Sequence, residues 1–370
     1  MLRRSKENEI KPRVFVTSIG QEDNLGDSVL RRGLLDSLDR SHVEVHVLVG
    51  SNSTSYISAL GLKSDDVIYE SRRAWRRSLM LSAFRGKCSL VFNAGEVRVD
   101  RAHSHLGRFQ TIAVAIIRLR GGAAIHTGVG IRDPAEPRDF AARCVLRMCN
   151  LVTWRDGKSR DWSGIGQVLP DWAFALGPQK VATDNTDLSL SRSFLAISMR
   201  GDRDFPSEDW FGAVRTILDE NGLTPILVTQ VVRDGDRSRA IARELGDGTK
   251  VVGWAGDTSH AVHETQVRDI YRNSTAVVSD RLHALVLGAT EGAVPLPLTV
   301  GSSEKLRRTL AVVGLDGFCI EQDEIPHYAI GNVARDALAR GTQVQVDEAR
   351  ERLTILCDTI VTHVAGGSGR

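Results

Sequence analysis

The residues best suited to chemistry lie in one short stretch, Val277–Pro295. A β-branched run ends at Ser279 and Asp280, and Arg281 and His283 stand where a helix would begin. The first turn of a helix presents free backbone N–H groups and the positive end of its dipole, which favour a phosphate or carboxylate. Arg281 is a fixed cation that binds such anions through two N–H groups, and His283 can give and take a proton near neutral pH. The pattern predicts an anion site with a proton-transfer group.

A structural interpretation of this stretch is the alternative: Asp280 would cap the helix, Arg281 would pair with Asp280, and His283 would be buried. A further cation favours the functional interpretation. Lys305 follows a turn at Gly301–Ser303, after the next apolar run of the chain. In a parallel sheet this loop would neighbour the loop that carries Arg281, although Lys305 taken alone would be a solvated side chain.

The elements that must position these residues follow the pattern of a parallel α/β sheet, with short β-branched runs alternating with amphipathic segments. Strands are expected at Val14–Ser18, Val43–Val49, Leu90–Asn93, Ala123–Thr127, Leu151–Thr153, Phe194–Ser198, Pro225–Thr229, Lys250–Val252 and Ala276–Ser279. Helices are expected at Asp27–Leu38, Phe140–Cys149 and Val346–His363.

The chain divides at a polar stretch that follows a complete α/β block. We expect an N-terminal Rossmann-like domain at residues 1–178, a linker at 179–192, a C-terminal Rossmann-like domain at 193–345, and a helix and tail at 346–370. Two such α/β domains facing a cleft have the outline of the glycosyltransferase B type. Ligands of open parallel sheets bind at the carboxyl ends of the strands, so the loops there are the candidate site.

Composition excludes several functional classes. The chain has 370 residues and a formal charge of +2 from 48 basic and 46 acidic side chains, which gives no overall attraction to nucleic acid. Its five cysteines are scattered and form no CxxC pair, which argues against a zinc site and fits a reducing compartment. The first residues lack the apolar stretch of a signal peptide, and no apolar run is long enough to span a membrane. We therefore expect a cytoplasmic protein.

A second motif, Asn24-Leu-Gly-Asp27, follows the first expected strand. Gly26 would allow a tight turn and Asp27 would cap the following helix. A structural cap and a role in binding a second substrate are equally supported. Arg132 follows Gly128-Val-Gly130, a glycine-rich loop where the backbone could approach a ligand.

The remaining candidates favour structural roles. Arg155, Asp156 and Ser159 have the pattern of a turn and helix cap. Trp172 and Phe174 are typical core residues, and His126 on an apolar strand is a typical core histidine.

Taken together, these motifs resemble polysaccharide pyruvyltransferases. The resemblance covers roughly residues 14–315 and depends on the order of its motifs more than on any single one. They are Asn24-Leu-Gly-Asp27, Arg155-Asp156 with Ser159, Asp171-Trp-Ala-Phe174, Ile197-Ser-Met-Arg200, the Ser-x-Arg-Leu-His-Ala block at Ser279–Ala284, and Lys305 ten residues beyond Pro295.

The resemblance implies an activity and a site. Phosphoenolpyruvate (PEP) would be the donor, a pair of hydroxyl groups on a glycan or lipid-linked saccharide the acceptor, and a pyruvate ketal the product, with no metal and no cofactor. The C-terminal domain would hold PEP and the N-terminal domain the acceptor. The implied roles are His283 and Asp27 in catalysis, Arg281, Lys305 and Arg200 in PEP binding, and Asn24, Gly26, Glu96 and Arg132 in acceptor binding.

One segment departs from the family pattern. Where many members have a glycine triplet, this chain reads Asn93-Ala-Gly-Glu-Val-Arg98, which places Glu96 in a loop that should face the cleft. Glu96 would bind sugar hydroxyls, or the loop has another shape.

Two other functions stay open. A glycosyltransferase that uses a nucleotide sugar would share the basic pocket but would also need a carboxylate for the ribose. The segment after Lys305 offers no clear one, and Glu321 and Asp323 are the residues there that stay open. A non-catalytic glycan-binding relative is the second.

The segment Ser71–Ser78 carries four arginines, Arg72, Arg73, Arg76 and Arg77, around Trp75. This cluster is either a contact with an anionic membrane surface or a solvated helix face.

Overall fold

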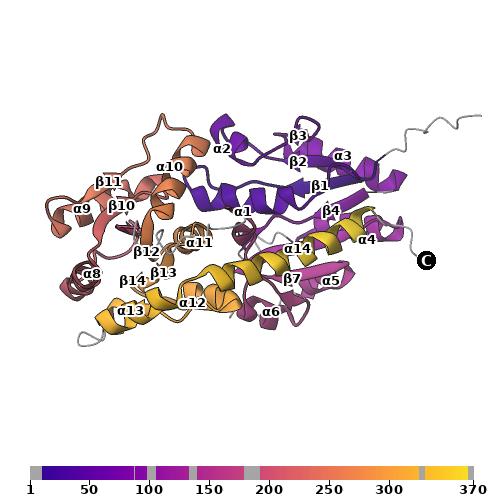
Figure 1. Cartoon of the computed structure of the whole chain (residues 1–370). Helices are drawn as coiled ribbons and strands as arrows, with labels where there is room; N and C mark the ends of the chain where they lie inside the picture. Colours follow the sequence, from indigo (N-terminus) through magenta and orange to yellow (C-terminus); the bar gives the residue numbers. More distant parts are fainter. Residues whose placement is uncertain are drawn as a thin grey trace, which may run out of the picture.

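The computed structural model describes residues 11–86, 88–97, 106–132, 140–178, 192–324 and 330–365. Nearly all of the predicted linker lies outside these ranges, so the domain limits drawn at 178 and 193 stay predictions. Within the described ranges the two predicted Rossmann-like units are present and face one another (Figure 1).

The N-terminal unit is built on an eight-stranded sheet in which every described pair is parallel. Its order is β3-β2-β1-β4-β6-β7-β8, with β5 pairing only β6. The strands are β1 (Arg13–Thr17), β2 (Glu44–Leu48), β3 (Val67–Tyr69), β4 (Cys88–Val91), β5 (Gly95–Val97), β6 (Ala124–Ile131), β7 (Leu151–Trp154) and β8 (Gln167–Val168).

Helices cover both faces of this sheet. The alternation of side chains in β1 shows the arrangement, because Val14 and Val16 point into one core and Phe15 into the other. The core around Phe15 is closed by α3 (Arg72–Arg85), α4 (Arg108–Leu119) and α5 (Phe140–Met148). The other helical elements of this unit are α1 (Leu25–Asp36), α2 (Thr54–Ala59), α6 (Gly157–Ser163) and the 3₁₀ helix η1 (Trp172–Ala175).

The C-terminal unit has a five-stranded parallel sheet of order β11-β10-β9-β12-β13. Its strands are β9 (Phe194–Ser198), β10 (Thr224–Val228), β11 (Lys250–Val252), β12 (Ser274–Ser279) and β13 (Val294–Leu296), and β14 (Leu298–Thr299) pairs β15 (Ile320–Glu321). Its helical elements are α8 (Glu208–Asn221), η2 (Val232–Asp234), α9 (Gly235–Leu245), α10 (His260–Arg272), α11 (Leu282–Thr290), α12 (Glu304–Leu310), η3 (Ala311–Val313), η4 (Gln322–Glu324) and α13 (Ile330–Arg340).

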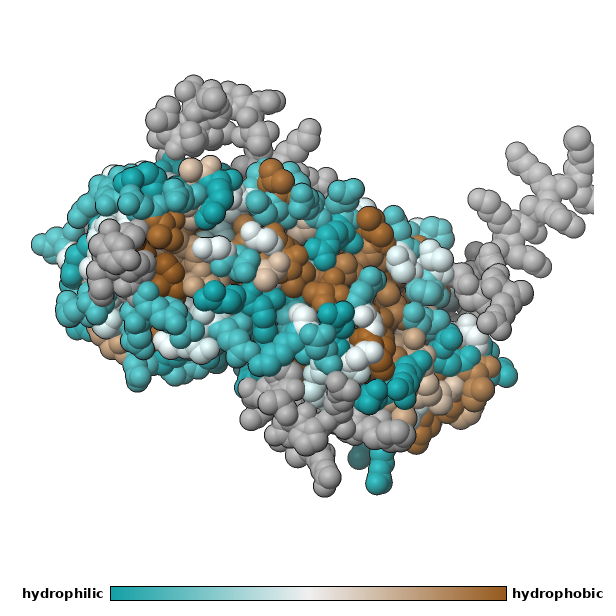
Figure 2. Space-filling view, turned by 90° about the horizontal axis from the view of Figure 1, so that it is seen from below, coloured by the Kyte–Doolittle hydropathy of each residue, from teal (hydrophilic) through white to brown (hydrophobic). Residues whose placement is uncertain are grey.

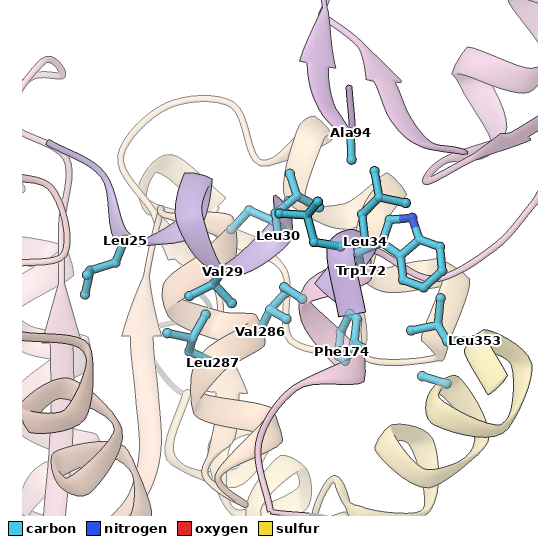
Figure 3. Packing of buried hydrophobic residues seen from close by; sticks show 14 of the residues in the cluster. Leu25, Val29, Leu30, Leu34, Ala94, Trp172, Phe174, Val286, Leu287 and Leu353 are labelled. Atoms are coloured by element: carbon cyan, nitrogen blue, oxygen red, sulfur yellow. The ribbon is translucent and has the colours of Figure 1, made fainter. Parts of the chain in front are cut away.

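One hydrophobic core joins the two units. Leu25, Val29 and Leu34 of α1 pack with Val286 of α11 and with η1 in a single cluster (Figure 3). The last helix, α14 (Gln343–Ala365), confirms the predicted C-terminal helix and runs back across both units (Figure 1). Its Arg350 and Arg352 side chains donate to backbone carbonyls of the N-terminal unit, at Phe174, Leu176 and Val168.

Within the described ranges, no helix combines the length and hydrophobicity that crossing a bilayer requires. Seen from below, the molecule is mostly hydrophilic, with apolar side chains gathered in a band and toward one end (Figure 2).

One sequence expectation about local structure is wrong, and one segment whose shape was left open is now defined. Gly128 and Gly130 belong to β6 and not to a loop after it. Gly128 has φ +66° at an irregularity in the pairing of β6 with β7, and a Cβ there would lie 2.3 Å from the Trp172 ring, so the glycine is required by close packing. Within Asn93–Arg98, Gly95–Val97 form the short strand β5, and Arg98 lies outside the described residues.

The strand order fixes where a ligand would bind. Each sheet changes the direction of its strand order at one point, between β1 and β4 in the first and between β9 and β12 in the second. Open parallel sheets bind ligands outside the carboxyl ends of the strands at such a point. The loops after all four of these strands meet in one cavity between the units.

Candidate active site

The cavity between the two units has a volume of about 440 Å³ and is strongly cationic. Eight arginine and lysine side chains line it, against three carboxylates, Asp27, Glu96 and Asp280. The eight are Arg31, Arg132, Arg155, Arg200, Arg203, Arg233, Arg281 and Lys305. Although the overall charge of the chain is near neutral, basic side chains outnumber acidic ones in the wall of this cavity, which suits a multiply charged anion. Of the nine predicted site residues, eight line the cavity. The ninth, Gly26, lies against the lining residue His283.

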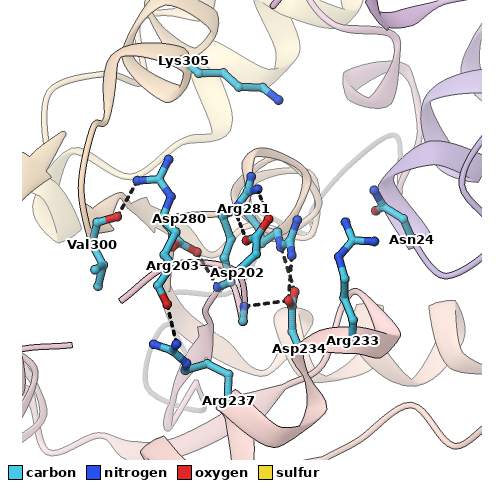
Figure 4. A network of polar contacts seen from close by, with 12 residues as sticks. Asn24, Asp202, Arg203, Arg233, Asp234, Arg237, Asp280, Arg281, Val300 and Lys305 are labelled. Atoms are coloured by element: carbon cyan, nitrogen blue, oxygen red, sulfur yellow. Dashed lines mark hydrogen bonds and ion pairs between the residues drawn. The ribbon is translucent and has the colours of Figure 1, made fainter. Parts of the chain in front are cut away.

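Arg281 is fixed before any ligand arrives. It is the N-cap of α11, and its Nε and Nη2 donate to the two carboxylate oxygens of Asp234 at 2.8 and 2.7 Å (Figure 4). Asp234 also accepts from the backbone N–H of Gly201, at 2.8 Å. These bonds leave Nη1 of the guanidinium for a ligand, in an orientation that the buried carboxylate determines.

The two arginines after β9 are held in a similar way. Arg200 donates to both carboxylate oxygens of Asp202, at 2.8 and 2.6 Å, and these bonds raise the pKa of Arg200. Arg203 donates to the backbone carbonyls of Val300 and Ser302, in the loop that leads to Lys305 (Figure 4). The backbone of one cationic loop is thus tied to the side chain of the other.

His283 occupies the first turn of α11 and is mostly buried, with 13% of its side chain exposed. Its Nε2 lies 3.6 Å from Oδ2 of Asp171, a fully buried carboxylate at the N-cap of η1 in the other unit. Burial raises the pKa of Asp171, but His283 and Arg155 outweigh that effect and hold it well below its usual range. An ionised carboxylate beside an imidazole orients the ring and stabilises its protonated form.

Gly26 is needed because His283 is so close. A Cβ at Gly26 would lie 2.2 Å from Nδ1 of His283. Gly26 has no positive φ, so the tight turn expected from the sequence is not the reason for the glycine. The amino ends of α1 and α11, one from each unit, therefore meet at the imidazole.

The cap of α1 differs from the sequence expectation. Asn24, and not Asp27, is the N-cap, and its side chain accepts from the Gly26 N–H at 3.0 Å. Asp27 lies in the first turn, accepts from the Gln21 N–H at 2.7 Å and pairs with Arg31 at 3.4 Å. Burial raises the pKa of Asp27, but Arg31, the Gln21 N–H and His283 together lower it below its usual value. Asp27 is thus an ionised carboxylate on the wall of the cavity.

Glu96 lies among cations. Its carboxylate is 3.0 Å from Lys305 Nζ, 2.9 Å from Arg132 and 3.9 Å from the buried Arg155. Burial would raise the pKa of Glu96, but Lys305 and Arg155 lower it to about 2. In return, burial and Arg155 lower the pKa of Lys305 to about 8, although Glu96 opposes that shift. The segment that departs from the family pattern therefore supplies a counter-ion to the cavity.

Asp280 is the third carboxylate of the cavity. Its Oδ1 accepts from the Arg200 N–H at 2.8 Å, while its buried Oδ2 has no hydrogen-bond partner. Burial raises the pKa of Asp280 to about 6, against the lowering effect of that N–H and of Arg281. The structural alternative considered for this stretch is therefore wrong in two respects: Asp280 does not cap α11, and Arg281 pairs with Asp234.

The expected structural residues are confirmed. Asp156 is the N-cap of α6 and accepts from the N–H and the hydroxyl of Ser159, at 2.8 and 2.9 Å. Trp172, Phe174 and His126 are fully buried. Arg155 has a larger role than the sequence indicated, because it lines the cavity and bonds to Asp171 at 3.2 Å.

Sequence reasoning assigned no role to several residues of the site: Asp171, Arg31, Arg203, Arg233 and Asp234. Asp171 belongs to the Asp171-Trp-Ala-Phe174 motif, and Arg203 lies close to Arg200 in the sequence, so both could have been found from the sequence. Among the described residues, no group of three or more His, Cys, Asp or Glu side chains is placed to hold a metal ion.

Comparison with known proteins decides the family. A family model described as polysaccharide pyruvyl transferase matches residues 24–302, about three quarters of the chain. The chain belongs to the polysaccharide pyruvyl transferase family. The matched range begins at Asn24 and ends at Ser302, so it includes cavity residues from both units of this pyruvyl transferase family member. No curated protein matches the chain.

Solved structures show the same fold for this pyruvyl transferase family member at low identity. The S. aureus MnaA–UDP co-structure has a TM-score of 0.54 at 12% identity, over 95% of this chain and 96% of that one. A Neisseria meningitidis UDP-GlcNAc 2-epimerase bound to UDP-GlcNAc has a TM-score of 0.53 at 9% identity, over 95% and 100%. A Methanocaldococcus jannaschii UDP-GlcNAc 2-epimerase has a TM-score of 0.52 at 10% identity, over 93% of this chain and 99% of that one. These likenesses support the two-domain glycosyltransferase B-type fold.

Proposed function

We propose that this protein transfers the pyruvyl group of PEP to two hydroxyl groups of a cell-surface or lipid-linked saccharide, forming a ketal and releasing phosphate. The observation that carries the proposal is the position of His283. The imidazole lies at the amino end of α11 beside Arg281, among eight cationic side chains, with the buried carboxylate of Asp171 behind it.

The donor half rests on charge and geometry. PEP carries about three negative charges near neutral pH, and charge-assisted hydrogen bonds from fixed donors hold such groups well. Arg281, Arg200 and Lys305 would bind its phosphate and carboxylate, with the free N–H groups of the first turn of α11. Arg281 and Arg200 are each held by a carboxylate, so little ordering is required when the anion binds.

The chemistry needs two protons to be added to PEP and two to be removed from the acceptor hydroxyl groups. The methylene carbon of PEP takes a proton, and the first hydroxyl group loses its proton as it attacks C2. The phosphate then leaves with a proton, and the second hydroxyl group loses its proton as it closes the ketal. His283 would give and recover a proton in each half of this sequence, since an imidazole does both near neutral pH. No step requires a metal ion or a further cofactor.

The acceptor half lies on the N-terminal unit. Asp27 and Glu96 are ionised carboxylates on the same cavity and would accept hydrogen bonds from sugar hydroxyl groups, with Asn24 and Arg132 beside them. Gly26 would let the imidazole and the acceptor approach closely. Asp27 would also serve as a second acid/base group, since His283 lies near enough to lower the pKa of Asp27.

The alternative is a glycosyltransferase that uses a nucleotide sugar, and it is favoured by the solved neighbours named with UDP or UDP-GlcNAc. Against it, neither carboxylate suggested for a ribose lines the cavity. Glu321 accepts instead from the N–H and hydroxyl of Ser303, at 2.7 and 3.0 Å, and Asp323 lies in η4.

Thermal unfolding in the presence of ligands separates these functions. PEP at millimolar concentration should raise the melting temperature, and UDP or GDP at the same concentration should not. The PEP effect should disappear in Arg281→Gln and remain in Arg239→Gln, an exposed arginine of α9. Stabilisation by UDP and not by PEP would replace the proposal with the nucleotide-sugar alternative, and stabilisation by neither would favour a non-catalytic glycan-binding protein.

A further inference from the structure

The three helices that cover one face of the N-terminal sheet have an unusual composition. Across α3, α4 and α5 there are nine arginines and neither an aspartate nor a glutamate. By contrast α8, which has the same length as α3, carries four acidic residues. Basic and acidic residues are nearly equal over the whole chain, so this layer holds a local surplus of positive charge. The arginines are Arg72, Arg73, Arg76, Arg77, Arg85, Arg108, Arg118, Arg143 and Arg147.

Most of this charge faces solvent without a counter-ion. Arg73, Arg77, Arg85, Arg118 and Arg147 are exposed, and no described carboxylate forms an ion pair with any of them. Arg76 differs, because its guanidinium lies over the ring of Phe109, 4.5 Å from the centroid. A surface of this kind attracts a polyanion.

The same helices expose large apolar side chains. On α4, Leu119 and Ile112 are 84% and 56% exposed, and on α3, Phe84 and Leu81 are 59% and 48% exposed. In α4 the positions of Phe109, Ile112, Ile116 and Leu119 recur at three or four residues, so they form one stripe along the helix. The two helices pack against each other in the same core, which brings their exposed residues onto one face. Trp75 does not belong to this face, since it is buried and donates to the His46 carbonyl.

We propose that the outer face of α3 and α4, the basic apolar face, docks on the surface of an anionic lipid bilayer. An amphipathic surface that combines arginines with exposed aliphatic and aromatic side chains suits the boundary between headgroups and acyl chains. The arginines are attracted to anionic headgroups, and the apolar side chains enter the interface. Exposed aliphatic side chains gain nothing from a nucleic acid, so the bilayer is the partner that both features fit.

The basic apolar face lies close to the cavity between the units. A role for membrane docking in reaching the acceptor follows from this position and rests on the proposed function. The amino-terminal turns of α3 and α4 border a second cavity of about 580 Å³, with Arg72, Arg76 and Arg108 in its wall. It shares Ile19 and Asn93 with the cationic cavity between the units. Docking would therefore hold the active site beside the membrane surface, where an anionic lipid-linked saccharide acceptor would meet these arginines.

Sedimentation of the full chain with lipid vesicles tests the proposal without requiring turnover of PEP. Vesicles of equal parts phosphatidylcholine and phosphatidylglycerol should bind the protein, and vesicles of phosphatidylcholine alone should not. Binding should weaken as salt is added, because the attraction is screened. The double variant Arg73→Gln/Arg77→Gln should lower the partition coefficient roughly 25-fold, since each arginine near an anionic surface contributes about a factor of five.

Matched variants control for total charge and for folding. Arg239→Gln/Arg243→Gln removes the same charge from α9 and should leave binding unchanged. Leu119→Gln should weaken binding to anionic vesicles, and Ile355→Gln, which changes an exposed residue of α14, should not. Equal losses in the test and control pairs would overturn the proposal, as would failure of the unaltered protein to bind. Equally tight binding to RNA, with no effect of Leu119→Gln, would assign the face to nucleic acid instead.

Discussion

Nε2 of His283 lies 3.6 Å from Oδ2 of Asp171, and the two residues belong to different units of the fold. Asp171 is held in turn by Arg155, at 3.2 Å, and by the N–H of Ala173, at 3.0 Å. The imidazole of one unit thus lies beside a buried, ionised carboxylate of the other, at a distance longer than a normal hydrogen bond. The surroundings of this imidazole therefore depend on how the two units pack together.

Asp171→Asn should separate the orienting role from a structural one. The amide keeps the shape of the side chain but removes the negative charge beside the imidazole of His283, so under the proposed function kcat should fall about 100-fold. The KM for PEP should change little, because Asp171 does not line the cavity. Steady-state rates as a function of pH provide the measurement. A lower melting temperature with an unchanged rate and pH profile would show that Asp171 only supports the fold.

Asp280→Asn should stabilise the protein at neutral pH. The pKa of Asp280 is raised to about 6 in the folded chain from 3.8, so between about pH 4 and pH 6 the folded form keeps a proton that the unfolded form has lost. Stability therefore falls as pH rises through this window, and the charged carboxylate costs about 1–3 kcal/mol above it. An amide does not titrate and keeps an oxygen for the Arg200 N–H.

Melting temperatures from pH 4 to pH 8, compared between the unaltered protein and Asp280→Asn, check this expectation. The difference should grow up to about pH 6 and then stay constant. Asp236→Asn, at an exposed position, is the control. A destabilised Asp280→Asn variant at pH 7 would show that the ionised carboxylate is held by favourable contacts.

Glu96→Gln should strengthen the binding of anions in the cavity. Glu96 is the carboxylate nearest to Lys305 and Arg132, so its removal leaves more positive charge for a ligand. The dissociation constant for inorganic phosphate should fall about 3-fold to 10-fold, an effect of about 1 kcal/mol. Titration calorimetry at low salt measures it, with Glu304→Gln as a control outside the cavity wall. Weaker phosphate binding would mean that the main effect of Glu96 is to position Lys305 and not to neutralise the charge of Lys305.

Glu264→Gln should loosen the two units. Glu264 of α10 is 6% exposed and pairs with Arg32 of α1 at 2.5 Å and with Arg268 at 2.7 Å. Loss of one partner in a buried ion cluster leaves uncompensated charge, so the free energy of unfolding should fall by roughly 3 kcal/mol. Chemical denaturation measures this change, and Glu244→Gln on α9 should have little effect. A change under about 0.5 kcal/mol, typical of surface positions, would contradict a role in joining the units.

The sequence predicted the elements well where the signal is local. The strands at Phe194–Ser198 and Lys250–Val252 have the predicted first and last residues, and Arg281 and His283 do lie at the beginning of the helix after β12. These features follow from β-branched runs and from the order of neighbouring residues. The parallel topology then brought Asn24, Glu96 and Lys305 to one edge, as the rule for open sheets requires.

The remaining features of the site depend on contacts between distant parts of the chain. The pairing of His283 with Asp171, and of Arg281 with Asp234, requires the relative position of the two units and the course of the loops between strands. The reason for Gly26 is likewise a neighbour from α11, and local turn chemistry could not indicate it. The sequence does not distinguish the cap of α1, because Asn24 and Asp27 both have side chains that cap helices.

Release of phosphate from PEP is the measurement that tests the central claim most directly. The unaltered protein, supplied with PEP and a pooled extract of cell-envelope glycans, should release phosphate only when the extract is present. His283→Gln should lower that rate at least about 100-fold, while His42→Gln, at an exposed position, should keep it. Release that does not depend on the extract, or that survives in His283→Gln, would contradict the account.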